Sequence, residues 1–235
     1  MGHSKPRLTL SMIVRNESGR YLKQALKQHR PFIDNAVIID DGSTDDTIDI
    51  CLEALKDLPV QLVRNTTSKF NNEISLRKQQ WEETLLTKPE WILNLDADEL
   101  FEAQFMDEVG SLIEQEEVDL YSFRLYDFWS STSYREDHYW QAHHYYRPFL
   151  LRYKPDFEYK WLETAQHCGR YPDNIYSLPN QISALRLKHM GWANPKDRLE
   201  KYNRYIRLDP EGKFGWLEQY KSILDEHPTL VDWVE

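Results

Sequence analysis

The first hundred residues alternate short apolar runs with segments whose apolar residues recur at helical spacing. Apolar runs bounded by polar residues are typical of buried strands, and such runs occupy residues 8–14, 36–39, 60–63 and 91–95. Apolar residues three and four positions apart predict helices, and they recur around residues 21–26, 48–55 and 74–85. Strands that alternate with helices predict an α/β fold with a parallel, doubly wound sheet.

The second half of the chain has a less regular pattern. It predicts a helix over 105–113 and strands over 119–126, 149–153 and 184–187. Asn194 followed by Pro195 and Asp197 is a typical helix start, with an N-cap, a first-turn proline and a first-turn acid. We therefore expect a C-terminal helical extension, made of a helix that buries Leu199 and a last helix over 216–226.

Composition and charge narrow the possible partners. The 235 residues are 40% hydrophobic and 29% charged, as in a folded globular protein. A net charge of -10 disfavours a nucleic acid partner, because phosphate backbones demand basic surfaces. No run approaches the roughly 20 apolar residues that span a bilayer, and two cysteines suit a reducing compartment. We expect a cytoplasmic protein without a membrane span, with peripheral contact at the inner face of the membrane left open.

Polar clusters follow directly after three of the expected strands. They are Arg15-Asn16, Asp40-Asp41 and Asp96-Ala97-Asp98. In a doubly wound sheet the carboxyl ends of the strands meet at one rim, where ligands bind, so we expect these clusters to converge. Asp96 and Asp98 can share a hard divalent cation and the ribose hydroxyls of a nucleotide, since Mg²⁺ and Mn²⁺ prefer oxygen ligands. The alternative for this pair is a solvated acidic turn.

The cluster after the second strand holds more acid than a turn requires. Gly42 and the acids that follow it fit a tight turn and the positive end of the next helix. They do not account for both Asp40 and Asp41. One carboxylate of this pair can accept the N–H of a uracil or thymine ring.

Three segments in this order resemble the family 2 glycosyltransferases, inverting enzymes with a GT-A fold. They are Ser11–Ser18 (SMIVRNES), Val37–Thr47 (VIIDDGSTDDT) and Trp91–Leu100 (WILNLDADEL). The resemblance implies a Rossmann-like, mainly parallel sheet flanked by helices. It also implies a single GT-A domain over 1–235, with the nucleotide sugar bound by residues 1–100 and the acceptor by residues 101–235.

The resemblance also implies roles for individual residues at the donor site. The residues that it assigns to the nucleotide sugar are Ile13, Arg15, Asn16, Glu17, Asp41, Arg77 and Asp96. Asp41 resembles the acid that binds the uracil or thymine ring, and Asp96 the first acid of the DxD motif, facing the ribose and the sugar. Arg77 stands where the family has an arginine near the phosphates, although Glu73 and its neighbours replace the usual small residues.

Asp98 resembles the second acid of the DxD motif, which binds the metal ion. Lys188-His189-Met190-Gly191-Trp192 resembles a later segment in which a histidine completes that site. We therefore expect Mn²⁺ or Mg²⁺ at Asp98 and His189, since a neutral imidazole can join a carboxylate in binding Mn²⁺. A core or surface histidine is the alternative. The charged helix that follows, which includes Lys201, either covers the diphosphate or presents a solvated face.

The implied activity is inverting transfer of a hexose from a UDP- or dTDP-sugar to an acceptor hydroxyl. Family analogy suggests a cell-surface glycan, a lipid-linked sugar or a surface protein as acceptor, within polysaccharide biosynthesis. Two alternatives differ in class. A sugar-nucleotide pyrophosphorylase usually begins with a Gly-rich phosphate loop, where this chain has Arg15-Asn16-Glu17. A non-catalytic carbohydrate-binding relative would not need the acids and the histidine at the site.

An inverting transfer needs a general base that takes the proton of the acceptor hydroxyl. We expect this base between residues 149 and 187, in the acceptor half. Glu163 follows Tyr159 and Trp161, aromatic residues that can flank a sugar and raise the pKa of a carboxylate by desolvation. We therefore predict Glu163 as the base, with His167 as its rival.

Overall fold

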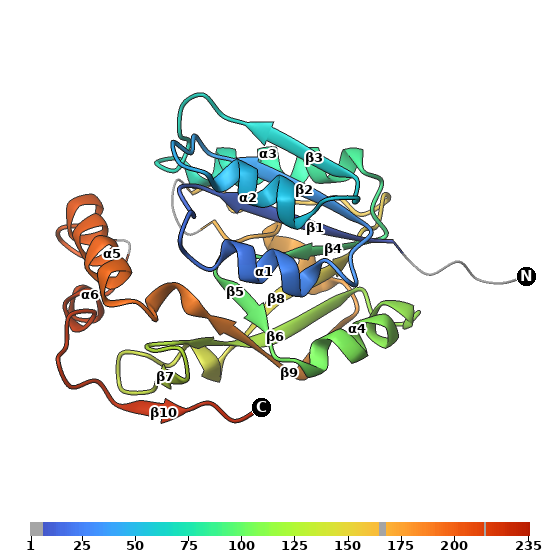
Figure 1. Cartoon of the computed structure of the whole chain (residues 1–235). Helices are drawn as coiled ribbons and strands as arrows, with labels where there is room; N and C mark the ends of the chain where they lie inside the picture. Colours follow the sequence, from blue (N-terminus) through green and yellow to red (C-terminus); the bar gives the residue numbers. More distant parts are fainter. Residues whose placement is uncertain (1–6, 165–167, 214) are drawn as a thin grey trace, which may run out of the picture.

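The structure is a computed structural model and describes residues 7–164, 168–213 and 215–235. Its main sheet has eight strands: β1 (Leu8–Val14), β2 (Asn35–Asp40), β3 (Val60–Arg64), β4 (Trp91–Asn94), β5 (Glu99–Phe101), β6 (Leu120–Asp127), β8 (Tyr146–Arg152) and β9 (Asn180–His189). They are ordered β3-β2-β1-β4-β8-β6-β9-β5 across the sheet (Figure 1). The strands predicted from apolar runs are all present.

The two halves of the sheet differ in direction. β3, β2, β1 and β4 are parallel to one another, as the alternation of strands and helices predicts. β8 then runs antiparallel to both β4 and β6, β9 runs parallel to β6, and β5 runs antiparallel to β9. The sequence pattern missed the three-residue strand β5, because so short a strand has no readable period. The prediction of a mainly parallel sheet is correct. The strands of mixed direction lie in the second half of the chain, where the hydrophobic pattern is also less regular.

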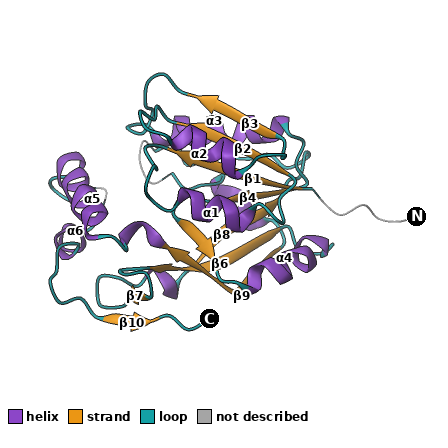
Figure 2. Ribbon diagram, in the orientation of Figure 1, coloured by secondary structure: helices purple, strands orange, loops and turns teal. Residues whose placement is uncertain are grey.

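Helices cover both faces of the sheet (Figure 2). They are α1 (Leu22–His29), α2 (Thr47–Ala54), α3 (Glu73–Leu86) and α4 (Gln104–Glu114). Successive side chains of a strand point to opposite faces, so one strand serves two cores. In β1, Leu10 and Met12 join the core with α1, α2 and α4, whereas Ile13 packs with Leu76 of α3 on the other face. This doubly wound arrangement leaves the carboxyl ends of β1, β2 and β4 at a common rim.

The C-terminal segment extends beyond one end of the sheet (Figure 1). It comprises α5 (Pro195–Leu208), α6 (Leu217–Ser222) and β10 (Leu230–Asp232), which pairs antiparallel with β7 (Ser133–Arg135). Asn194 caps α5 as predicted, its side chain accepting a hydrogen bond from the Lys196 amide at 2.9 Å. The prediction that α5 buries Leu199 is wrong, because that side chain is 49% exposed. α5 packs instead through Tyr202 and Tyr205 against an aromatic cluster that includes Trp192. This contact covers only a narrow face of the helix.

Three short 3₁₀ helices complete the described part of residues 101–235: η1 (Ala142–His144), η2 (Asp173–Ser177) and η3 (Met190–Trp192). Both cysteines, Cys51 and Cys168, are buried and free. Among the described helices, none combines the length and the apolar character that crossing a membrane requires.

Candidate active site

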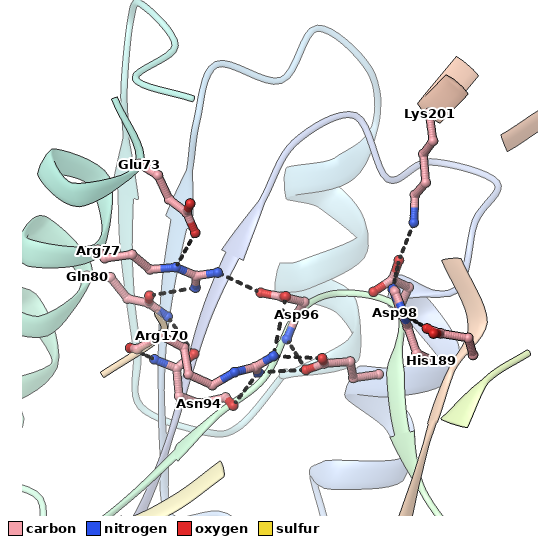
Figure 3. A network of polar contacts seen from close by, with 11 residues as sticks. Glu73, Arg77, Gln80, Asn94, Asp96, Asp98, Arg170, His189 and Lys201 are labelled. Carbon is pink, nitrogen blue, oxygen red and sulfur yellow. Dashed lines mark hydrogen bonds and ion pairs between the residues drawn. The ribbon is translucent and has the colours of Figure 1, made fainter. Parts of the chain in front are cut away.

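The acids that follow β4 point toward two different groups of partners (Figure 3). Asp96 faces arginines from α3 and from the segment before η2, and Asp98 faces His189 at the end of β9 and Lys201 of α5. The main chain after β4 follows β1, since the Leu95 amide donates to the Ser11 carbonyl at 3.2 Å. The two acids therefore emerge at the predicted rim.

Asp96 lies between two guanidinium groups. Arg77 Nη2 is 3.3 Å from Asp96 Oδ1, and Arg170 Nη2 is 3.7 Å from Asp96 Oδ2. Burial by itself would raise the pKa of Asp96, but the two arginines outweigh burial and lower it. The carboxylate is thus charged, and it can accept hydrogen bonds from hydroxyl groups of a ligand.

Arg170 is held in place by Glu99, a residue to which the sequence analysis gave no role. The two guanidinium nitrogens Nη1 and Nη2 each donate to one carboxylate oxygen of Glu99 at 2.8 Å. The Arg170 guanidinium also lies 4.2 Å from the centre of the Phe149 ring. Glu99 Oε2 accepts the Asp96 amide at 2.8 Å, so the same acid fixes the DxD turn. One signal was available, because an acid directly before Leu100 and Phe101 in a buried strand requires a partner.

Asp98 and His189 are neighbours, as the predicted metal site requires. His189 Nε2 is 3.5 Å from Asp98 Oδ2, and Nδ1 is 2.7 Å from Asp127 Oδ1 at the end of β6. Lys201 Nζ is also 3.5 Å from Asp98 Oδ2. Burial alone would lower the pKa of His189, but Asp98 and Asp127 outweigh burial and raise it to about 10. Burial alone would raise the pKa of Asp98, but His189 and Lys201 outweigh that effect and lower it.

These residues fit a divalent cation. A carboxylate and an imidazole suit Mn²⁺, and Asp127 at the second ring nitrogen is the kind of partner that orients a metal-binding histidine. Gly191 keeps the space between them open, since a Cβ there would lie 3.0 Å from His189 Nε2 and closer still to Asp98 and Lys201. Binding a cation would release the proton of His189 and displace Lys201 from Asp98.

The residues after β1 join the loops after β2 and β3. Asp41 is fully buried, and its carboxylate accepts hydrogen bonds from Asn65 Nδ2 at 3.0 Å, Ser68 Oγ at 2.6 Å and the Lys69 amide at 2.9 Å. Arg15 Nη1 donates to the same Ser68 hydroxyl at 2.7 Å. Asp41 therefore organises the loop over residues 65–69, and a base N–H would have to share or replace one of these donors.

Asn16 and Glu17 fix the loop that follows β2. Asn16 Oδ1 accepts the Thr44 amide at 2.8 Å, and the backbone amide of Glu17 donates to Thr47 Oγ1 at 2.7 Å. Asn16 has a φ of 52°, a left-handed conformation that asparagine tolerates better than most residues. The side chain of Glu17 is half-buried, and burial together with the nearby Asp98 raises its pKa from 4.5 to about 7. The charged form of Glu17 is thus disfavoured at this position beside the candidate metal site.

We expect Glu17→Gln to stabilise the protein at pH 8 but not at pH 4. A carboxyl whose pKa is raised on folding binds more protons in the folded state, so stability falls as the pH rises from about 4.5 to about 7. Glutamine does not titrate, so the variant does not lose stability over this pH range at position 17. The melting temperature at pH 8 should rise by at least about 2–4 °C, the shift that about 1 kcal/mol produces in a chain of this size. Thermal unfolding across this pH range checks the expectation, and an equal shift at both pH values would contradict it.

Two adjoining clefts open at this rim. The smaller, about 340 Å³, has Ile13, Arg15, Glu17, Asp98, His189 and Lys201 among its lining residues. The larger, about 460 Å³, is lined mainly by Arg147, Leu162, Arg170, Asp173 and Tyr176. Glu73, Arg77 and Asp96 border both clefts. Both volumes fall within the roughly 300–1,000 Å³ of typical small-molecule sites.

Glu163 lies in a different environment from the one expected. Its side chain is 66% exposed and pairs with Lys78 of α3. Tyr159 and Trp161 do not flank it but pack against Trp81, with ring centroids 4.8 and 6.3 Å from that indole. Leu162, the residue before it, lines the larger cleft. His167, its rival, lies outside the described residues.

A mainly parallel, curled sheet flanked by helices, with acids beyond β4 beside adjoining clefts, defines the GT-A type of glycosyltransferase fold. The sequence model of glycosyl transferase family 2 matches residues 10–170, and the chain belongs to this family. The fold resembles that of TarS from S. aureus, with a TM-score of 0.53 and 13% identity over 93% of this chain and 42% of TarS. A second TarS structure contains residues 1–349 in complex with UDP-GlcNAc. Its comparison with this chain gives a TM-score of 0.53 and 14% identity over 93% of this chain and 70% of the TarS chain.

Two sequence relatives match almost the whole chain. The glycosyltransferase SunS from Bacillus subtilis is 25% identical over 245 residues, which are 98% of this chain and 53% of SunS. An uncharacterised protein from Mycobacterium tuberculosis is 24% identical over 240 residues, which are 92% of this chain and 54% of that protein. The chain thus spans about half the length of the curated relatives that it matches.

Proposed function

We propose that this chain is the GT-A domain of an inverting hexosyltransferase, which transfers a sugar from a UDP- or dTDP-sugar to an acceptor hydroxyl. The single observation that carries the proposal is the position of Asp96, which borders both adjoining clefts, with Asp98 in the lining of the smaller one. One cleft can hold the nucleotide and the other the acceptor, so that the bond to be broken lies beside the two acids. Family membership and the complex of TarS with UDP-GlcNAc support a nucleotide-sugar donor.

The residues divide into donor and acceptor groups under this proposal. Ile13, Arg15, Asn16 and Glu17 line or shape the nucleotide end of the smaller cleft, and Asp41 reads the base. Arg77 lies near the phosphates. Residues 1–100 thus supply most of the donor site, and residues 101–235 supply the acceptor site together with the donor-side residues Arg170, His189 and Lys201. A glycan, a lipid-linked sugar or a protein fits the acceptor role, because the larger cleft is open and carries both charged and aromatic side chains.

Asp98 and His189 would hold Mn²⁺ or Mg²⁺, with Asp127 orienting the imidazole. A divalent cation at this point supplies positive charge that stabilises the departing diphosphate. Asp96 accepts hydrogen bonds from the ribose or the donor sugar, and Arg77 and Arg170 keep its carboxylate charged and oriented. Lys201 adds a second positive charge on the same side of the cleft.

A thermal-shift panel of nucleotides, with and without Mn²⁺, tests the proposed donor class. UDP or dTDP should stabilise the chain more strongly than GDP, because a ligand that binds the folded state raises its melting temperature. Manganese should enlarge the effect. Equal stabilisation by GDP would remove the base-reading role of Asp41. Slow hydrolysis of a UDP-sugar by the purified chain would exclude a non-catalytic carbohydrate-binding function.

We predict that Glu163→Gln keeps donor affinity and lowers turnover by about 100-fold or more, the usual scale for a general base. Its exposed position beside the larger cleft is compatible with a base that contacts the acceptor only in the complex. Turnover with saturating acceptor, together with calorimetric affinity for UDP, checks the prediction.

Asp173→Asn is the matched variant for this experiment, because Asp173 lines the larger cleft. If Glu163→Gln turns over normally while Asp173→Asn does not, the base is Asp173. If both turn over normally and His167→Ala does not, the base is His167.

A further inference from the structure

Three metal-ligating side chains gather at the end of β7, and none of them belongs to the site described above. They are Glu136, His143 and His144, whose ligand atoms all lie within 4.8 Å of one another. His143 Nε2 is 3.4 Å from Glu136 Oε2, and His144 Nε2 is 3.7 Å from Glu136 Oε1. Ligands at about 2.0–2.1 Å from a tetrahedral Zn²⁺ lie about 3.3 Å apart. The two contacts to Glu136 are close to that spacing, and the widest pair of ligand atoms, no more than 4.8 Å apart, must close by up to about 1.5 Å.

One of the three ligands is buried without a hydrogen-bond partner. The His143 side chain is only 6% exposed, and within the described part of the chain its Nε2 atom has the Glu136 carboxylate at 3.4 Å as a neighbour but no hydrogen bond of good geometry. A buried polar atom without a partner costs free energy, and binding a cation would recover it. The atom points toward the Glu136 carboxylate, which is 39% exposed and open to an incoming ion.

Neighbouring groups hold two of the ligands in position. The His143 ring stacks on Tyr126 at a centroid distance of 5.1 Å and meets the Tyr134 ring edge-on at 5.2 Å. Tyr134 Oη donates to Glu136 Oε2 at 3.3 Å, and the Glu136 amide donates to the Thr229 carbonyl at 3.1 Å. Rotamers that are already fixed lower the entropic cost of binding.

We propose that Glu136, His143 and His144 form a zinc site with an open fourth position. Two imidazoles and one carboxylate favour Zn²⁺ over Mg²⁺, which prefers oxygen ligands. The ion would join η1 to the end of β7 and, through Thr229, to the segment before β10. The Ala142 carbonyl in η1 accepts a hydrogen bond from Arg147 Nη1 at 2.7 Å, so the same ion would steady one wall of the larger cleft.

The test is calorimetric titration of Zn²⁺ into the full chain after removal of metals with a chelator. We expect the wild type to bind one Zn²⁺ at this site. His144→Ala and Glu136→Gln should each weaken that binding by about 100-fold or more, since even outer partners of a metal site are worth 10- to 100-fold. The His144 side chain is half exposed and Glu136→Gln keeps the shape of the side chain, so both variants should fold.

Two control variants separate this site from other ligands. His227→Ala removes an exposed histidine elsewhere and should bind Zn²⁺ like the wild type. Asp98→Asn disables the candidate site at the rim and should leave the binding at Glu136 intact. Titration with Co²⁺ should give the visible absorption of a tetrahedral ion in the wild type and in Asp98→Asn, but not in His144→Ala. Zinc binding that is unchanged in both His144→Ala and Glu136→Gln, or absent from the wild type, would overturn the proposal.

Discussion

Asp98→Asn is expected to abolish the dependence of UDP binding on Mn²⁺ and to lower sugar transfer by about two to three orders of magnitude. The loss follows because a cation held by Asp98 would supply positive charge where the negative charge of the departing diphosphate develops, and removing one such contact usually costs about 100- to 1,000-fold. Asparagine keeps the size of the side chain. Calorimetry of UDP with Mn²⁺ and with EDTA, together with a transfer assay, measures both effects.

Asp107→Asn provides the control, because Asp107 is an exposed acid on α4 away from the clefts. It should bind UDP and transfer sugar like the wild type. If the wild type itself binds UDP equally well with Mn²⁺ and with EDTA, the metal assignment is wrong. Lys201 would then be the cation that faces the diphosphate, and Lys201→Met should cause the loss instead.

Glu99→Ala is expected to destabilise the protein by about 3–5 kcal/mol, the usual cost of removing one partner of a buried ion pair. Arg170 would keep its charge, with only 13% of its side chain exposed, but would lose both hydrogen bonds to Glu99. The Asp96 amide would lose its acceptor as well. Denaturant unfolding measures the change in the free energy of unfolding. Because Glu99 positions Arg170 and the Asp96 amide, the variant should also bind the donor more weakly.

Glu53→Ala is the matched comparison. Glu53 pairs with Lys23 at 3.4 Å on the surface, where its side chain is 70% exposed. Exposed pairs contribute only about 0–1 kcal/mol, so this variant should unfold close to the wild type. Comparable losses in Glu53→Ala and Glu99→Ala would mean that burial does not set the strength of the Arg170 pair.

The fold of the first hundred residues could be predicted from local pattern. The strands over 8–14 and 91–95 are continuous apolar runs because both faces of a parallel sheet are covered by helices. Since such strands share one direction, their polar ends had to meet at one rim. The sequence therefore predicts correctly that Asp96 and Asp98 lie at this rim.

The fold of residues 101–235 could not be predicted in the same way. Its strands β6, β8 and β9 change direction within the sheet, and the order in which they pair depends on long-range packing. Its aromatic residues were expected around Glu163 but pack around Trp81. An aromatic side chain can be buried in any nearby hydrophobic cluster. Its position in the sequence therefore does not reveal which hydrophobic cluster it joins.

The sequence by itself determined the family, the parallel half of the sheet and the acids at its rim, because each depends on residues close together in the chain. Only the tertiary structure decided which charges face those acids. Arg170 meets Glu99 across 71 residues, and His189 meets Asp127 across 62. His189 and Asp127 stand at the ends of β9 and β6, whereas Arg170 reaches Glu99 from the segment before η2. The spacing of these residues along the chain does not indicate that they are in contact. The open space at Gly191, which lets Asp98, His189 and Lys201 approach one another, is likewise a property of the folded chain alone.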